Sequence, residues 1–344
     1  MAKKFDVVIG NPPYGEDAEG KATHGKPIYD RFMDAAYEVA DKAVLITPAR
    51  FLFNAGYTPK AWNAKMLSDE HLSVVYYAPN SDALFPGTDI KGGVVVTYRD
   101  ANKSGTAIGT FTSYPELNEI VQKVSSRSKD SLASLMTSSR SYRYTEAMHE
   151  SHPEAKNMMA KGEQFKINTK TFDQLPFLYS EDLPSGSKAY VRVYGLHQRT
   201  RMYKWIEKAF VSGPSSFEHY KVALPKANGA GRLGEALSHP VVLEPEVAVT
   251  QSFLTIGDFE AQTEAEACLK YVKTKFARVM LGVLKITQDN PARVWQHVPV
   301  QDFSSASDIA WDKPISEIDS QLFAKYGLSD PEVEFIMTTA KEMD

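Results

Sequence analysis

Residues 5–14 read Phe-Asp-Val-Val-Ile-Gly-Asn-Pro-Pro-Tyr, and this stretch decides the interpretation of the fold. Phe5 to Ile9 is a short apolar run with β-branched residues, which predicts a buried strand of a parallel sheet. Gly10 ends the run, and the four residues after it form a turn in which two consecutive prolines fix φ. In open α/β sheets, ligands bind at the carboxyl ends of the strands. The sequence therefore predicts a rigid binding turn at the end of this strand.

The residue types in the turn suit a planar base that carries an exocyclic amino group. The side-chain oxygen of Asn11 and the carbonyl of Pro12 can each accept one amino hydrogen. The ring of Tyr14 can stack on the face of the base. The alternative is a proline turn that follows a core strand and binds nothing.

The next hundred residues continue the pattern of an α/β sheet. Pro27 opens a predicted helix whose apolar face consists of Ile28, Phe32, Ala35 and Val39. Ala43 to Thr47 is the next buried strand, so strand, helix and strand follow within about 40 residues, which is a βαβ unit with parallel strands. A further helix is expected at 61–67, and further strands at 72–77 and 92–98.

Two of these segments resemble motifs of a known family. Asn11-Pro12-Pro13-Tyr14 after a hydrophobic strand resembles the catalytic motif of the amino-group DNA methyltransferases, in the form typical of N6-adenine enzymes. Phe85-Pro-Gly-Thr-Asp-Ile-Lys-Gly-Gly93 before a valine strand resembles a later motif, near which an aromatic residue packs on the flipped base. The resemblance implies that Asn11, Pro12, Pro13 and Tyr14 are catalytic, and that Tyr14 and Phe85 stack on the base. A core phenylalanine at a loop–strand junction is the alternative for Phe85.

Segments beyond Lys221 resemble adenine methyltransferases fused to restriction enzymes, so the resemblance covers nearly the whole chain. It implies an α/β fold: half of a doubly wound, Rossmann-like methyltransferase sheet, then a mixed α+β target-recognition domain and a helical tail. The corresponding divisions are residues 1–112, 113–262 and 263–344. Within the tail, Thr263 to Lys285 predicts one long amphipathic helix, with Thr263 as N-cap and Glu266 completing a capping box.

Charge is distributed unevenly along the chain. The formal net charge is −4, yet the segment from Arg127 to Arg232 holds 17 Lys and Arg against 10 Asp and Glu. Such an excess predicts contact with phosphate groups, and the alternative is a solvated surface with an accidental surplus. Cations also stand beside aromatic residues here, as in 199–205. The residues that we expect to bind double-stranded DNA are Arg192, Arg199, Arg201, Lys204 and Lys226.

S-adenosylmethionine is the methyl donor that the resemblance implies. The family elements that hold it, a glycine-rich turn and an acidic residue, lie upstream of the Asn-Pro-Pro-Tyr motif, and here only ten residues precede Asn11. Residues 229–234 spell a dinucleotide fingerprint, but Pro240 follows too closely for the long helix that a phosphate site needs. We therefore expect weak donor binding or none by these residues alone. Three explanations stand: a partner chain supplies the amino-terminal half, the chain is a fragment, or it is a noncatalytic DNA-recognition relative.

Composition narrows the functional class. A hydrophobic content of 43% and a charged content of 24% are those of a soluble globular protein, and no apolar run approaches the roughly 18 residues of a membrane span. Cys268 is the one cysteine, which fits a cytoplasmic location, and no histidines stand at metal-ligand spacing. The predicted function is site-specific methylation of N6 of a flipped adenine, within a restriction–modification system. The alternatives are a noncatalytic DNA-recognition subunit and an RNA or protein N-methyltransferase.

Overall fold

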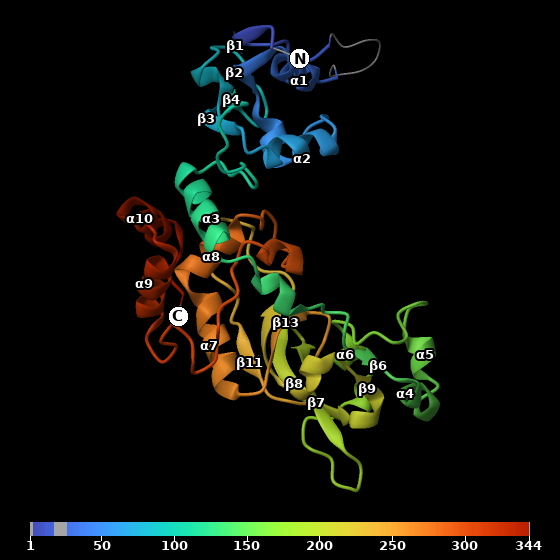
Figure 1. The fold of residues 1–344 in the computed structure, drawn as a ribbon. Coiled ribbons are helices and arrows are strands. Elements are labelled where there is room, and N and C mark those ends of the chain that lie inside the picture. Colours follow the sequence, from blue (N-terminus) through green and yellow to red (C-terminus); the bar gives the residue numbers. More distant parts are fainter. Residues whose placement is uncertain (1–2, 17–25, 344) are drawn as a thin grey trace. The chain divides into compact units, whose positions relative to one another are not determined.

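The computed structural model describes residues 3–16 and 26–343, and the chain divides into two units, Met1–Asn118 and Glu119–Asp344 (Figure 1). The architecture is mixed α/β, which confirms the predicted class at that level. None of the described helices is long and apolar enough to cross a membrane.

The smaller unit is built on one four-stranded sheet with the strand order β1-β2-β4-β3. Its elements are β1 (Phe5–Gly10), α1 (Tyr29–Val39), β2 (Ala40–Pro48), α2 (Lys60–Ser68), β3 (Leu72–Ala78) and β4 (Val94–Asp100). β1 pairs in parallel with β2, as the βαβ spacing predicts, whereas β4 runs antiparallel to both β2 and β3. The sheet is mixed because the chain returns from β3 to β4 at the same sheet edge, without a long helical crossover.

Helices cover only one face of this sheet. α1 and α2 lie on the same side of the strands in Figure 1, and their buried residues form one core with Ala43, Leu45 and Val95. The other face keeps apolar side chains exposed. On β1, Phe5, Val7 and Ile9 are 52%, 46% and 75% exposed. The prediction of a buried strand was therefore wrong, because β1 is an edge strand with a bare face.

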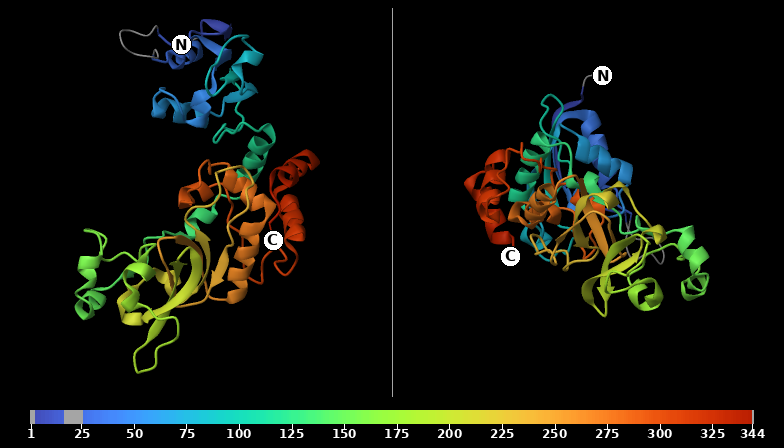
Figure 2. Two further views of the ribbon diagram at one scale, coloured as in Figure 1. Left: turned by 180° about the vertical axis from the view of Figure 1, so that it is seen from behind. Right: turned by 90° about the horizontal axis from the view of Figure 1, so that it is seen from below.

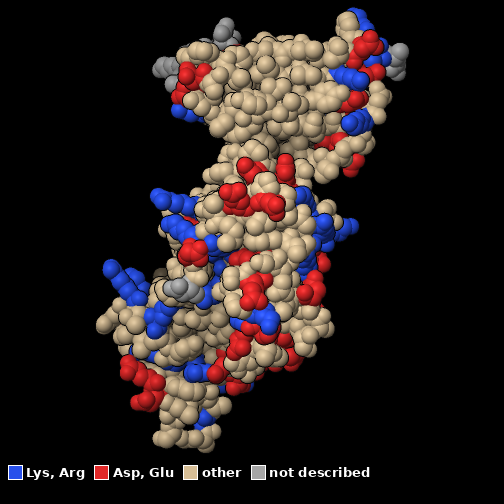
Figure 3. All heavy atoms as spheres, turned by 90° about the vertical axis from the view of Figure 1, so that its left-hand side faces the viewer, with Lys and Arg blue, Asp and Glu red and all other residues tan. Residues whose placement is uncertain are grey.

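The same exposure appears at the opposite edge of the sheet, where Val75 and Tyr76 of β3 are 63% and 49% exposed. Figure 3 shows a broad area of this unit without Lys, Arg, Asp or Glu side chains. An exposed apolar sheet face of this kind indicates an interaction surface or an aggregation liability.

Helix α1 packs through a different face from the predicted one. Its buried residues include Tyr29, Met33 and Ala36, whereas Phe32 is 44% exposed. Both sets recur at helical spacing and both contain apolar residues, so periodicity alone does not separate them. The large side chains of Tyr29 and Met33 fill the core beside Trp62, and this leaves Phe32 outside.

The larger unit contains a four-stranded sheet in the order β11-β10-β13-β5, a three-stranded sheet in the order β12-β7-β8, and the pair β6-β9. The strands are β5 (Met136–Thr137), β6 (Arg143–Tyr144), β7 (Tyr190–His197), β8 (Thr200–Glu207), β9 (Val211–Ser212), β10 (Tyr220–Pro225), β11 (Val241–Leu243), β12 (Val247–Val249) and β13 (Phe253–Phe259).

Helices flank these sheets. They are α4 (Glu146–Ser151), α5 (Ala155–Met158), α6 (Thr171–Gln174), α7 (Gln262–Lys273), α8 (Lys275–Gly282), α9 (Ile315–Tyr326) and α10 (Asp330–Thr339), while α3 (Pro115–Arg127) spans the boundary in sequence between the units. α7 packs on β10, β11 and β13, and α9 and α10 lie outside α7 and α8 (Figures 1 and 2).

The single helix predicted from Thr263 to Lys285 is two helices in the structure. α7 begins at Gln262, so its N-cap is Ala261 and not the predicted Thr263. The N–H of Ala261 donates to the carboxylate of Glu264. Thr274 then leaves the helical conformation, and its hydroxyl accepts a hydrogen bond of 3.1 Å from the N–H of Ala277. Thr274 thus caps the start of α8.

Candidate functional site

The turn Asn11–Tyr14 lies at one edge of the smaller sheet. β1 ends at Gly10, and its neighbour β2 runs parallel to it and ends at Pro48. Pro48 pairs with Val94, the first residue of β4, and Val94 also pairs with Ala78, the last residue of β3. Three segments therefore leave the sheet at the same end of its strands: the turn after β1, the segment after β2 and the loop 79–93. β1 and β4 are two strand spacings apart, which is about 10 Å.

The turn itself is tied to the segment that enters α1. The carbonyl of Tyr14 accepts a hydrogen bond of 3.3 Å from the N–H of Ile28, and the N–H of Glu16 donates to the carbonyl of Lys26 at 2.9 Å. Asn11 is exposed, whereas Tyr14 is half-buried. Backbone pairing on one side and two prolines on the other hold the turn, and the Asn11 amide remains open to a ligand.

The hydroxyl of Tyr14 is buried and makes no hydrogen bond of standard geometry with a described residue. Burial raises the pKa of this hydroxyl above its ordinary value, and the nearby Asn11 side chain opposes the shift in smaller measure. Tyr14 is therefore neutral at physiological pH, and what it offers a ligand is its ring.

Phe85, the other residue predicted to stack on a base, is half-buried in the loop 79–93. Its N–H donates to the carbonyl of Ser81 at 2.8 Å, and its carbonyl accepts from the N–H and hydroxyl of Thr88 at 3.1 and 2.7 Å. The N–H of Gly87 donates to Asp82 Oδ1 at 2.7 Å. These bonds hold the loop around Phe85 in one conformation.

The loop 79–93 is joined to the end of β2. The N–H of Ala49 donates to the carbonyl of Gly93 at 3.0 Å, and Arg50 Nε donates to the carbonyl of Lys91 at 2.6 Å. Gly93 has a φ of +80°, and a side chain there would collide with the carbonyl of Ala78. The Gly-Gly pair before the valine strand thus permits the tight return of the chain at this edge. The structure brings the Asn11–Tyr14 turn and the Phe85 loop to one sheet edge, and their roles stay predictions.

Three of the five cations predicted to bind DNA have protein partners in the larger unit. Arg192 pairs with Glu244 and lies over the ring of Tyr203. Arg201 donates from its two terminal nitrogens to the carbonyls of Ser238 and His239. Lys204 is 8% exposed and lies 3.8 Å from Glu181. These three side chains are largely committed to the fold.

The other two cations are exposed, and no ion pair or side-chain hydrogen bond joins them to a described residue. Arg199 stands at the tip of the β7–β8 hairpin, where it and Gln198 have φ values of +68° and +50° between the paired His197 and Thr200. Such a two-residue turn normally uses glycine or asparagine, so an arginine here is a strained choice that indicates a functional constraint. Lys226 follows the end of β10.

The glycine loop 229–234 is filled from within. The carboxylate of Glu235 accepts hydrogen bonds from the N–H groups of Ala230, Gly231 and Arg232 at 2.9, 3.2 and 3.3 Å. It also pairs with the buried ammonium of Lys285. A phosphate would need these same donors, so the loop does not fit a dinucleotide or a nucleoside cofactor. This agrees with its rejection from sequence.

Burial alone would raise the pKa of Glu235, but the ion pair with Lys285 and the loop N–H bonds outweigh burial and leave the pKa below its ordinary value. The loop is therefore closed by a carboxylate that stays ionised at neutral pH.

Sequence reasoning missed a group of polar residues that line two hollows of the larger unit: Arg140, Gln251, Ser252, Asn290 and Arg293. They come from three distant segments, and none lies in a recognisable motif. Only the tertiary fold brings them together.

Comparison with known proteins supports the resemblance. Residues 1–85 match the model of the Eco57I restriction-modification methylase family. A protein of Mycoplasma pneumoniae (strain ATCC 29342 / M129 / Subtype 1), named an uncharacterized adenine-specific methylase, is 28% identical over 110 residues, which are 30% of this chain and 26% of that protein. These matches confirm the resemblance to restriction–modification adenine methylases that the Asn-Pro-Pro-Tyr motif indicates.

Two solved structures align over most of the chain at low similarity. The type IIG restriction endonuclease BpuSI aligns with 92% of this chain and 50% of its own, at 8% identity and a TM-score of 0.31. The type IIL restriction-modification enzyme MmeI, solved in complex with DNA, aligns with 97% of this chain and 56% of its own, at 8% identity and a TM-score of 0.32. Scores this low establish no common fold. The chain spans about a quarter of the curated relative and about half of each solved chain.

Proposed function

We propose that this chain supplies the acceptor side of a site-specific N6-adenine DNA methyltransferase of a restriction–modification system. The observation that carries the proposal is the Asn11–Tyr14 turn, which stands at the carboxyl end of β1 inside the segment that matches the methylase family model. A rigid turn with an exposed amide and a half-buried aromatic ring is what an extruded adenine requires.

In this proposal, Asn11 Oδ1 and the carbonyl of Pro12 each accept one hydrogen of the adenine amino group. These two bonds orient the amino nitrogen and leave its lone pair free to attack, and Tyr14 stacks on the base. Pro13 stiffens the turn, so the acceptors are in place before the base arrives. The base must leave the duplex first, because its amino group lies inside the stack. Phe85, at the same sheet edge, is proposed as a second stacking surface.

The methyl donor proposed from the family is S-adenosylmethionine. The glycine loop 229–234 does not fit it, because Glu235 occupies the N–H groups that a bound cofactor would need. We therefore assign no step of the donor to this chain.

The edge of β1 is the proposed place for the segment that holds the donor. Among the described strands, β1 pairs with β2 alone, and this pairing has no register shift along Phe5–Gly10. At the opposite edge, a register shift between Val74 and Tyr76 disrupts the ladder and blunts β3. A further strand, from the same protein or a partner chain, would pair with the backbone groups of β1, and the elements that accompany this strand would cover the face that carries Phe5, Val7 and Ile9. The donor site would then stand beside Asn11.

The test is methyl transfer from labelled S-adenosylmethionine to DNA by the assembly that contains this chain. Asn11→Ala should abolish formation of N6-methyladenine, measured by mass spectrometry of digested DNA, while DNA binding persists. Tyr14→Ala removes a base–aromatic stack, which is worth about 1–3 kcal/mol, and should lower turnover by roughly 10- to 100-fold. Tyr14→Phe is the matched control and should retain most activity, because the hydroxyl makes no hydrogen bond of standard geometry with a described residue. Wild-type turnover by Asn11→Ala would refute the assignment.

The second candidate is a noncatalytic DNA-recognition subunit, which is favoured by the occupation of the glycine-loop N–H groups by Glu235. The same assay separates the two functions. If the complete assembly binds DNA and the donor but transfers no methyl group, the recognition role replaces the catalytic one.

A further inference from the structure

The larger unit has two adjoining hollows at one end of the sheet β11-β10-β13-β5. One has a volume of about 390 Å³ and is lined by residues that include Arg140, Lys226, Asn290 and Arg293. The other has a volume of about 510 Å³ and is lined by residues that include Arg199, Lys226, Gln251 and Ser252. Because Lys226 lines both, the two hollows together are called the groove here.

The sheet register explains why these distant segments meet. β10 ends at Pro225, which pairs with Phe253 at the start of β13, and Thr255 of β13 pairs with Thr137 at the end of β5. The same end of the sheet therefore holds Lys226, the residues before Phe253 and the residues after Thr137. The segment 289–293 is held there too, because the N–H of Asn290 donates to the carbonyl of Lys226 at 2.9 Å.

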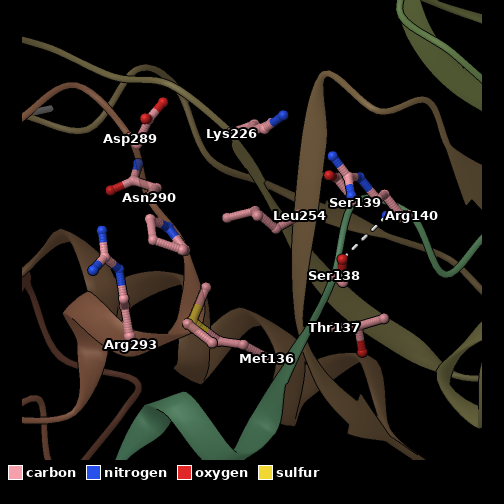
Figure 4. A pocket seen from close by; sticks show the side chains of 12 residues that line it. Met136, Thr137, Ser138, Ser139, Arg140, Lys226, Leu254, Asp289, Asn290 and Arg293 are labelled. Carbon is pink, nitrogen blue, oxygen red and sulfur yellow. Dashed lines mark hydrogen bonds between the residues drawn. The ribbon is translucent and has the colours of Figure 1, made fainter.

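Unpaired cations surround the groove. Arg140, Arg199, Lys226 and Arg293 are exposed, and no ion pair or side-chain hydrogen bond joins any of them to a described residue. Asp289 is the one acidic residue among the side chains that line the two hollows. Figure 4 shows Arg293 on one side of the first hollow and Lys226 and Arg140 on the other, with Leu254 and Met136 between them.

Several buried polar atoms in the groove walls have no partner among the described residues. They are Gln251 Nε2, Ser252 Oγ and Asn290 Oδ1. Asn290 is fully buried and fixed by its other side-chain atom, Nδ2, which donates to the carbonyl of Pro225 at 3.3 Å. Buried polar atoms are normally satisfied by protein or by ordered water, so these atoms leave unused hydrogen-bonding capacity in the walls of the groove. Amide groups recognise base edges, and cations neutralise phosphates.

We propose that the groove binds one strand of duplex DNA, with Arg140, Lys226 and Arg293 on phosphates and Gln251 on a base edge. The inference rests on the proposed function, since it takes DNA as the partner, and it specifies where the DNA lies on the larger unit. It also replaces most of the contact residues expected from sequence. Arg192, Arg201 and Lys204 support the fold, while Arg140 and Arg293 take over as phosphate contacts.

The first experiment measures DNA affinity of the full chain over a range of salt concentrations by fluorescence anisotropy of a labelled duplex. Each phosphate contact contributes about 0.9 to the slope of log affinity against log salt, so Arg140→Ala with Arg293→Ala should flatten the slope by about 1.8. The matched control is Lys156→Ala with Lys161→Ala. These two lysines are also exposed, lie in the same unit and line neither hollow. The control should bind as the wild type does.

The outcomes separate the inference from the proposed function. If the wild type shows no salt-dependent DNA binding, DNA is not the partner and both fall. If the wild type binds DNA but the salt slope falls equally in the groove variant and in the control, the positive charge acts diffusely. That result refutes the groove as the DNA-binding site and leaves the proposed function standing. Arg140→Lys with Arg293→Lys keeps both charges and should retain the wild-type slope. Loss of binding in that variant, which keeps both charges, would show that binding does not depend on the charge of these residues and would overturn the proposed phosphate contacts.

The second experiment tests base reading. Gln251→Leu removes the amide but approximates the shape of the side chain, and it should leave the salt slope unchanged. When a randomised duplex pool is selected by binding and sequenced, the variant should lose the preference at one base pair by about tenfold or more, as expected for loss of one amide–base contact. An unchanged sequence preference would refute the role of Gln251.

Discussion

The buried pair Glu235–Lys285 provides the sharpest test of how the larger unit is held together. Lys285 is 2% exposed at its side chain and Glu235 is 10% exposed. Besides the carboxylate, the ammonium of Lys285 donates to two carbonyls of the described residues, those of Asn228 and Thr287, at 2.8 and 3.1 Å. Glu235→Gln would remove the charge that compensates a buried ammonium and weaken the acceptor of three loop N–H groups.

The expected cost follows from this burial. Removing one partner of a buried ion pair typically destabilises a protein by about 3–5 kcal/mol, because the remaining charge is left uncompensated. Lys285→Met in the Glu235→Gln background removes that charge as well, so the double variant should be more stable than the sum of the single effects implies. Denaturant unfolding, followed by tryptophan fluorescence and corrected for the separate transition of the smaller unit, measures each value.

The dependence on pH has a definite sign. The pKa of Glu235 is lower in the folded chain than its ordinary value of 4.5. Its stabilisation is therefore complete above about pH 4.5 and is lost as the pH falls through the folded pKa. The difference in the free energy of unfolding between wild type and Glu235→Gln should therefore decrease as the pH falls through that acidic range. A Gln variant within about 0.5 kcal/mol of wild type at neutral pH, or strictly additive single and double variants, would refute the reasoning.

Two further predictions concern other parts of the chain. His219 bonds Asp258, which raises the pKa of the imidazole above 6.5. The bond between His219 and Asp258 therefore stabilises the fold fully below pH 6.5, and this stabilisation is lost as the pH rises through the folded pKa of His219. The difference in Tm between wild type and His219→Gln should decrease over that range. A difference in Tm that does not change with pH would contradict the role of His219. On the smaller unit, Val7→Lys with Val75→Lys places charge on the bare sheet face and should reduce self-association in sedimentation experiments, whereas Met158→Lys at an exposed site of the larger unit should not. Equal self-association of the wild type and both variants would show that the bare face of the smaller sheet does not mediate self-association.

Local chemistry predicted the strand that ends at Gly10, the turn after it and the parallel pairing of β1 with β2. These features depend on residues close together in the sequence. The buried face of α1 was not predictable in the same way, because two apolar sets, one with Phe32 and one with Met33, share the same period. The choice between them is made by α2, where Trp62 packs edge-on against Tyr29 with ring centroids 6.1 Å apart.

The break between α7 and α8 shows the same limit. The pattern from Thr263 to Lys285 is helical throughout, and nothing near Thr274 in the sequence requires an interruption. The cause lies in α9, where the buried carboxylate of Asp319 accepts hydrogen bonds from the N–H groups of Lys275 and Phe276 at 3.0 and 2.9 Å. These donors become free only if a new helix starts there. A residue more than 40 positions away in sequence therefore sets the helix boundary.

Ion pairs formed in the tertiary fold likewise decide which cations are available to the proposed DNA partner. A count along the chain identifies a basic segment, but electrostatic attraction depends on which cations the fold leaves without acidic neighbours. Glu244 and Glu246 lie outside that segment, yet they pair with Arg192 and Lys208 inside it. Arg293, also outside the segment, forms no ion pair with a described residue and stands at the groove. The surplus inferred from sequence is thus redistributed by tertiary pairing, and the DNA-binding surface is expected where pairing leaves positive charge beside unsatisfied amide groups.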